Sequence, residues 1–333
     1  MESIENSRST NFRFSLINKC FKDGGVESDG DILQQILQSK TDIDIWKLKT
    51  VAWKLCILHS YRCQCYRYLL GISSAYTESR DVIEKHREEE AHVLLKCLQT
   101  MRIYEGTIEN DKLMPTSWDI VQMILILRRE LPIEKIKSLK NIENNLVVST
   151  VKAIVRCIDL LCHDDWMNLF HISRELINTL DETFHPVKLS QTIAEIREEV
   201  ESRLGMEPEE FLIFMNDFSL ELILKTGCCE ILHSEKAIFK VLDKVCTKQA
   251  FVPLLRDLII EYITHVDRVQ RTASITKVRN RQLSRDDEIK LVNAAIDAAI
   301  NEKGSSRSTQ KSSNASLIEN NYSSSISNLN AAL

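Results

Sequence analysis

The chain is almost without the two residues that most often make turns. It has 8 glycines and 5 prolines in 333 residues, whereas ordinary usage of about 12% would give roughly 40. Barrels, sandwiches and phosphate-binding loops need these residues, because glycine adopts positive φ and proline fixes φ. The shortage argues against a Rossmann, P-loop or protein-kinase fold and predicts an all-α protein.

Apolar residues repeat at helical spacing through the middle of the chain. The clearest stripe has spacings of four and three residues and consists of Val147, Val151, Ile154, Ile158 and Leu161. Further stripes begin at Phe211 and at Phe251. Such stripes are typical of amphipathic helices that pack on neighbours. Ser117 or Thr116 is expected to cap a helix that follows Pro115, and Ser284 is expected to cap a last helix. The stripes predict a single body of stacked or antiparallel helices over residues 31–303. A degenerate helical repeat would give the same stripes.

The two ends differ in composition from this body. Residues 1–30 are polar and include Asp23-Gly24-Gly25, so we expect a flexible leader. Residues 304–333 are rich in Ser and Asn. This stretch offers too little apolar surface to offset its ordering entropy, which predicts a disordered tail.

Charge and hydropathy indicate a soluble intracellular protein. The net charge of −5 predicts no overall affinity for nucleic acid. The N-terminus lacks the apolar stretch of a signal peptide, and the sequence has no apolar run long enough to span a membrane. The ten cysteines are too few for a disulfide scaffold, and most are expected to be free thiols inside helices.

Residues 44–60 are predicted to form one helix, capped by Asp44, that is apolar on two opposite sides. At about 100° per residue, one face carries Leu48, Val51, Leu55 and Leu58, and the other carries Trp46, Trp53 and Ile57. A helix of this kind must be covered twice. It is either a central core helix or a helix whose tryptophan face docks a partner, since Trp is enriched in interface hot spots.

The same segment resembles the N-terminal signature of a known family. That signature runs Trp, aromatic, Leu, basic, Thr, followed by a small-and-aliphatic helix, and the matching residues are Trp46, Leu48, Lys49, Thr50, Leu55, Ile57 and Ser60. The family also has a nearby charged helix, which residues 88–95 would match, and a long body of stacked helices. In these features the chain resembles the Mei-four family of meiotic double-strand-break accessory scaffolds.

This resemblance implies a non-enzymatic scaffold in the nucleus, on meiotic chromosomes. Its N-terminal helix would bind the helical C-terminal segment of a partner that carries a pleckstrin-homology-like domain. The complex would bind DNA and promote double-strand-break formation by a topoisomerase-like enzyme. Carried over by position, the partner contact would consist of Trp46, Leu48, Thr50 and Leu55. Trp53 joins them on geometric grounds, because it shares the face of Trp46.

A basic segment over residues 268–285 is the candidate for DNA contact. It contains no acidic residue and six basic ones, which are Arg268, Arg271, Lys277, Arg279, Arg281 and Arg285. Phosphate contacts need such clusters and are blind to base sequence. The alternation of the central three by two residues favours a loop or extended arm. A solvated linker or a nuclear-import patch is the alternative.

Catalytic and metal sites are poorly supported by the sequence. Two Glu-x-x-His pairs, Glu182 with His185 and Glu230 with His233, have the spacing of a helical-bundle di-iron protein. Cys63, Cys65 and His59 supply only three potential zinc ligands, without knuckle spacing. We therefore expect no enzyme, cofactor, metal or small-molecule substrate. A helical adaptor in nuclear transport or RNA export is the main alternative function.

Overall fold

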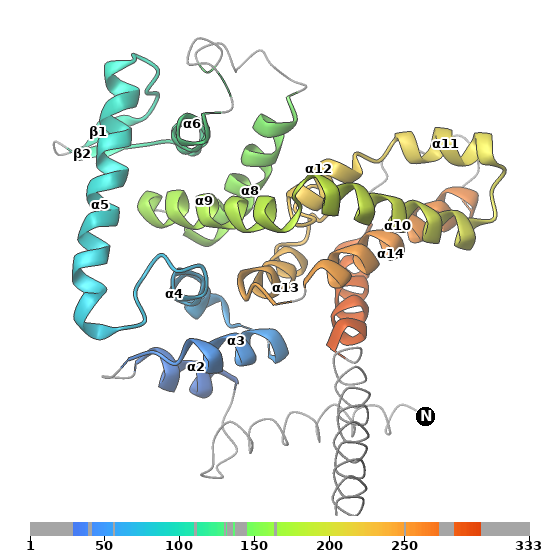
Figure 1. The fold of residues 1–333 in the computed structure, drawn as a ribbon, viewed down its shortest axis with the longest axis horizontal. Coiled ribbons are helices and arrows are strands. Elements are labelled where there is room, and N and C mark those ends of the chain that lie inside the picture. Colours follow the sequence, from blue (N-terminus) through green and yellow to red (C-terminus); the bar gives the residue numbers. More distant parts are fainter. Residues whose placement is uncertain are drawn as a thin grey trace, which may run out of the picture. The chain divides into compact units, whose positions relative to one another are not determined.

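The described part of the chain is almost entirely helical, which confirms the predicted all-α class (Figure 1). In the computed structural model the described residues are 29–38, 42–55, 57–109, 112–129, 131, 136, 145–162, 165–249, 251–272 and 283–300. The predicted tail and residues 1–28 of the predicted leader lie outside them, whereas Asp29 and Gly30 already belong to the first described helix.

The helices and strands of the described residues run in this order along the chain. They are α2 (Asp29–Leu37), α3 (Ile45–Lys54), α4 (His59–Leu69), α5 (Thr77–Thr100), β1 (Thr107–Glu109), β2 (Lys112–Met114), α6 (Ser117–Arg128), α8 (Leu146–Cys162), α9 (Trp166–Thr183), α10 (Pro186–Leu204), α11 (Pro208–Asn216), α12 (Leu220–Lys225), α13 (Glu235–Cys246) and α14 (Phe251–Thr272). Residues 285–300 form a further helix.

One short antiparallel hairpin interrupts the helices. β1 pairs with β2 so that Thr107 lies opposite Met114 and Glu109 opposite Lys112. Gly106 precedes the hairpin, and a Cβ atom there would collide with the carbonyl oxygen of Met114 and with the Tyr104 ring. The hairpin therefore depends on a residue without a side chain at this position.

Contacts divide the chain into two compact units that interleave along the sequence. Unit 1 comprises residues 1–185, 221–231 and 238–249, and unit 2 comprises residues 186–220, 232–237 and 250–333. The sequence predicted one helical domain over residues 31–303. Helical periodicity identifies the face that a helix buries, but it does not say which distant segment covers that face.

In unit 1 the predicted stripe on α8 is the centre of the packing. α8 packs on α6 and α9, and Val151, Ile154 and Ile158 are fully buried. The start of α6 is capped by Thr116, one of the two residues predicted for this cap. Thr116 Oγ1 accepts a hydrogen bond from Asp119 N at 3.2 Å, and Asp119 Oδ2 accepts one from Thr116 N at 2.8 Å. This capping box satisfies backbone donors at the helix start.

In unit 2 the main contact is between α10 and α14, which run side by side in Figure 1. The predicted stripe on α14 is buried, including Leu254 and Leu258. Ser284 caps the helix over 285–300, as predicted, by accepting from Asp287 N at 3.2 Å. Within that helix, buried Glu288 accepts hydrogen bonds from the backbone N–H groups of His233 and Ser234. The carboxylate thereby satisfies donors just before α13 begins.

Candidate interaction surface

The first turn of α3 presents a tryptophan to solvent. Asp44 caps the helix, as predicted, since its Oδ1 accepts from Lys47 N at 2.9 Å. Trp46 follows two residues later, and 70% of its surface is exposed. A cap of this kind fixes where the helix begins. The backbone at Trp46 therefore has a fixed helical conformation.

The start of α5 is fastened beside the start of α3. Ile43 N donates to the carbonyl oxygen of Ala75 at 2.9 Å, and Thr77 N donates to Asp42 Oδ1 at 2.9 Å. Tyr76, which lies between these two anchored residues, is 67% exposed. Two large exposed aromatic side chains, Trp46 and Tyr76, therefore belong to backbone segments that are hydrogen-bonded to each other. We call this pair, Trp46 and Tyr76, the aromatic surface of unit 1.

The predicted helix over residues 44–60 is in fact two helices. α3 ends at Lys54, Leu55 has extended backbone angles, and α4 begins at His59. Leu58, predicted to share a face with Leu48 and Val51, is exposed, whereas these two residues are buried. No glycine or proline marks this break. The apolar residues keep their helical spacing across it, so the sequence pattern predicts one helix where there are two.

The five predicted partner contacts do not form one surface. Leu48, Trp53 and Leu55 are buried, with Trp53 only 4% exposed. Thr50 is half-buried, and its hydroxyl donates to the carbonyl oxygen of Trp46 within the same helix. The two tryptophans lie about 20° apart around the helix axis, but unit 1 covers the last turn of α3 and leaves the first turn open. The two tryptophans therefore do share a side of α3, but of the two only Trp46 is exposed to a partner.

A buried charged cluster holds the far end of α3. Lys244 Nζ donates to the carbonyl oxygens of Ala52 and Leu55 at 2.8 and 3.0 Å. A cation at a helix C-terminus is favourable, because the last carbonyl groups have no partner within the helix. α3 is thus capped at both ends, by Asp44 and by Lys244.

The neighbour of this lysine organises the same cluster. Asp243, 1% exposed, accepts from Arg62 Nε at 3.1 Å and from the Tyr66 hydroxyl at 2.7 Å. Burial raises the pKa of Asp243, and the charges of Arg62 and Lys244 oppose that rise. Burial also raises the pKa of Tyr66, so its hydroxyl keeps the proton that it donates. The cluster joins α4 to α13 inside unit 1.

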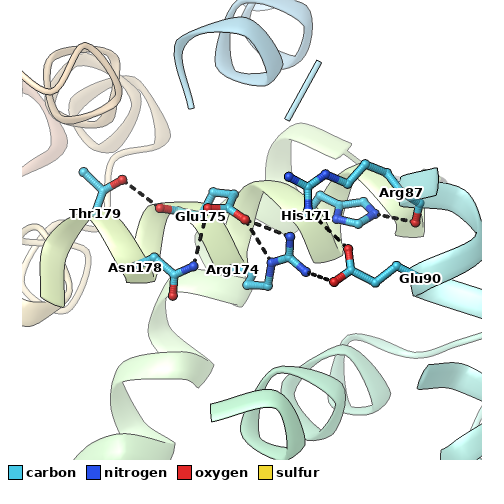
Figure 2. A network of polar contacts seen from close by, with 7 residues as sticks. All are labelled: Arg87, Glu90, His171, Arg174, Glu175, Asn178 and Thr179. Atoms are coloured by element: carbon cyan, nitrogen blue, oxygen red, sulfur yellow. Dashed lines mark hydrogen bonds and ion pairs between the residues drawn. The ribbon is translucent and has the colours of Figure 1, made fainter. Parts of the chain in front are cut away.

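A second polar network attaches the middle of α5 to α9, as Figure 2 shows. Arg174 donates to Glu90 Oε1 of α5 at 2.7 Å and to Glu175 Oε1 of its own helix at 2.8 Å. Arg87 donates to the second oxygen of Glu90 at 3.2 Å. Burial raises the pKa of Glu90, but the guanidinium groups of Arg174 and Arg87 together outweigh that effect and lower the pKa. Sequence reasoning missed this network, because Glu90 ends a run of acidic residues that resembles a solvated face.

His171 lies beside that network and is 4% exposed. Its Nε2 is 3.0 Å from the carbonyl oxygen of Arg87, so the neutral ring donates a hydrogen bond from α9 to α5. Burial lowers the pKa of His171 to about 4, and the nearby Arg174 charge acts in the same direction. The imidazole has a structural role, because its hydrogen bond to a backbone carbonyl connects α9 to α5.

We expect this histidine to make the stability of unit 1 depend on pH. Its pKa is near 6.5 when unfolded and about 4 when folded, so protonation favours the unfolded chain. The contribution of neutral His171 to the free energy of unfolding is fully present above pH 6.5 and is lost as the pH falls to 4. The total loss is about 3 kcal/mol. Urea unfolding at pH 7 and pH 4 measures it.

Two variants separate this effect from the titration of carboxylates. His171→Gln keeps a donor for the Arg87 carbonyl but does not titrate, so its free energy of unfolding should fall less on acidification. His86→Gln, at an exposed position on α5, should behave like the wild type. An identical pH dependence in His171→Gln and wild type would contradict the assignment.

The predicted basic segment is described only at its two ends. Arg268 and Arg271 belong to the last turns of α14 and not to an extended arm. Arg285 is exposed at the start of the next helix and is followed directly by Asp286 and Asp287. The other three residues, Lys277, Arg279 and Arg281, lie outside the described residues.

The candidate metal ligands are not gathered into a site. Glu182, His185, Glu230 and His233 are all exposed, whereas a di-iron site needs its ligands to project into a bundle core. Within the described ranges, no three His, Cys, Asp or Glu side chains lie close enough together to hold a metal ion. Cys65 is buried away from water, and that burial raises its pKa to about 12.

Comparison with known proteins adds no relative. Neither a scan against family models nor a search of curated proteins finds a match to this chain. Among the described helices, none combines the length and apolar character needed to cross a membrane. The candidate site therefore rests on the geometry of α3 and α5.

Proposed function

We propose that this protein is a non-catalytic helical scaffold whose aromatic surface docks a helical segment of a partner. The observation that carries the proposal is the 70% exposure of Trp46 on a helix capped at both ends. A rigid, exposed tryptophan supplies a large contact area with little loss of side-chain entropy, which is why Trp dominates interface hot spots. Tyr76 on the joined segment adds a second anchor.

The resemblance to the Mei-four family suggests the partner and the place. The partner would be the helical C-terminal segment of a protein with a pleckstrin-homology-like domain, in the nucleus and on meiotic chromosomes. The complex would promote double-strand-break formation. DNA contact belongs to the basic segment between Arg268 and Arg285, and it would be insensitive to base sequence but sensitive to salt.

Partner binding is tested with the full chain and purified C-terminal segments of pleckstrin-homology-like-domain proteins from the meiotic chromosome axis. We expect Trp46→Ala to raise Kd by about 30-fold or more, because a hot-spot truncation removes at least about 2 kcal/mol. Tyr76→Ala should weaken binding by a smaller factor. Isothermal titration calorimetry measures both.

Leu212→Ala is the matched control, since this leucine is also exposed but lies on α11. It should leave Kd unchanged. Unchanged binding in Trp46→Ala would show that the aromatic surface is not the partner-binding site. Trp46-dependent binding to a nuclear-transport or RNA-export protein, with none to the axis segments, would favour the adaptor alternative.

A further inference from the structure

The short helix α11 of unit 2 exposes two large aliphatic side chains. Of its nine residues only Phe211 and Met215 are buried, and they belong to the stripe that the sequence predicts. Ile213 is 71% exposed and Leu212 is 57% exposed. Single exposed apolar residues are common on protein surfaces, but two neighbours on one short helix form an apolar patch that the buried stripe does not explain.

The patch lies on the outward side of the helix. At about 100° per residue, Ile213 is directly opposite the side that Phe211 and Met215 bury. Leu212 and Phe214 flank it, about 100° away on either side, and Phe214 is half-buried. We call Leu212, Ile213 and Phe214 the apolar face of α11.

Carboxylates lie at both ends of this apolar face. Glu209 is one turn before Ile213 and Asp217 is one turn after it, so both lie on the same side of the helix. Glu210 is one turn before Phe214. All three acidic residues are exposed. The face is therefore apolar at its centre and acidic at its edge, and a polar rim around an apolar centre is typical of protein interfaces.

The chain around α11 is strongly negative. Residues 198–217 contain seven acidic residues and one basic residue, Arg203. That arginine is already paired with Glu199 at 2.7 Å and with Glu261 at 2.5 Å. The segment has a net charge of −6, which is larger in magnitude than the −5 of the whole chain. A cationic partner would therefore be attracted to this part of unit 2.

We propose that the apolar face of α11 docks a cationic amphipathic helix of a partner protein. The apolar stripe of such a helix would cover Leu212 and Ile213, and its lysine or arginine side chains would lie opposite the carboxylates. A second copy of this chain fits poorly, because a symmetric contact would bring identical carboxylates together. The inference is independent of the proposed scaffold function, since α11 belongs to unit 2 and the aromatic surface to unit 1.

The experiment uses the full chain and a fluorescent peptide of leucine and lysine, about 14 residues or four turns long, with its leucines at helical spacing. Fluorescence anisotropy should show saturable binding that weakens as salt rises from about 0.1 M to 1 M, because salt screens the charges. Leu212→Ser combined with Ile213→Ser should raise Kd by about tenfold or more. Glu209→Gln combined with Glu210→Gln should raise Kd and reduce its salt dependence.

Matched controls remove the same kinds of group elsewhere. Val187→Ser removes an exposed apolar side chain from α10. Glu88→Gln combined with Glu89→Gln removes two exposed carboxylates from α5. Both proteins should bind the peptide like the wild type. Far-UV circular dichroism establishes that each variant is folded before binding is measured.

A peptide of the same composition, with its leucines spread around the helix, separates docking from charge attraction and should bind more weakly. Equal binding of the two peptides, or an unchanged Kd in the Leu212 and Ile213 double variant, would overturn the proposal. So would loss of peptide binding in Trp46→Ala, since it would place the peptide on the aromatic surface. Dimerisation of the wild type that the same double variant abolishes would mean that a second copy covers the face instead.

Discussion

Asp243→Asn should lower the free energy of unfolding by about 3–5 kcal/mol, the cost of breaking a buried ion pair. The carboxylate accepts hydrogen bonds from Arg62 and from the Tyr66 hydroxyl. A carboxamide has the same size, but only one of its two polar atoms accepts, and its NH2 group would face a donor. The substitution also removes the only negative charge in the buried cluster of Arg62, Tyr66, Asp243 and Lys244. Urea denaturation followed by circular dichroism measures the loss.

Two further variants test whether this cost arises from the cluster. Asp81→Asn, at an exposed position on α5, should change stability by less than about 0.5 kcal/mol. Arg62→Met combined with Asp243→Asn should cost less than the sum of the two single changes, since each removes the partner of the other. Additive losses would mean that the ion pair contributes little.

Trp53→Ala should destabilise the protein by about 3–5 kcal/mol, as large-to-small changes in a core do. Its indole is 4% exposed at the end of α3, so truncation leaves a cavity that the surrounding side chains fill only in part. Trp46→Ala removes the same group at a site that is 70% exposed and should cost less than about 0.5 kcal/mol. Thermal unfolding of both variants compares them directly.

The two tryptophans are each other's control, since they lie on the same helix and share a substitution. Similar losses for both would contradict the burial difference. The comparison also decides how partner binding should be tested. Loss of binding in Trp53→Ala would reflect damage to unit 1, whereas loss of binding in Trp46→Ala reports on the aromatic surface itself.

Helix starts were the most predictable local features of this chain. Residue type and position predict caps at Asp44, at Thr116 or Ser117, and at Ser284. The structure has Asp44, Thr116 and Ser284 as caps, and each accepts a hydrogen bond from the third residue that follows it. Capping is local, because the donor and acceptor are three residues apart. The break after Lys54 was missed, because a cap supplied by Lys244 comes from a segment almost 200 residues away.

The candidate site could be predicted only in part for a related reason. Position around a helix axis follows from the sequence, and it correctly places Trp46 and Trp53 on the same side of α3. Exposure does not follow from it, because a neighbour can cover one turn and leave the next one open. The pairing of Arg174 with Glu90 likewise joins residues far apart in the chain. Tyr76 had no signal in the sequence that would link it to Trp46.

The sequence by itself determined the all-α class, the caps and the buried stripes of α8 and α14, since these depend on turn-residue scarcity and on interactions within a few residues. Tertiary structure decided which segments return to pack in unit 1 or unit 2. It also decided which of the two α3 tryptophans faces water. The physical reason is that burial and pairing each need two surfaces, a helix face and the distant segment that covers it. The spacing of residues along one helix specifies only the first of these.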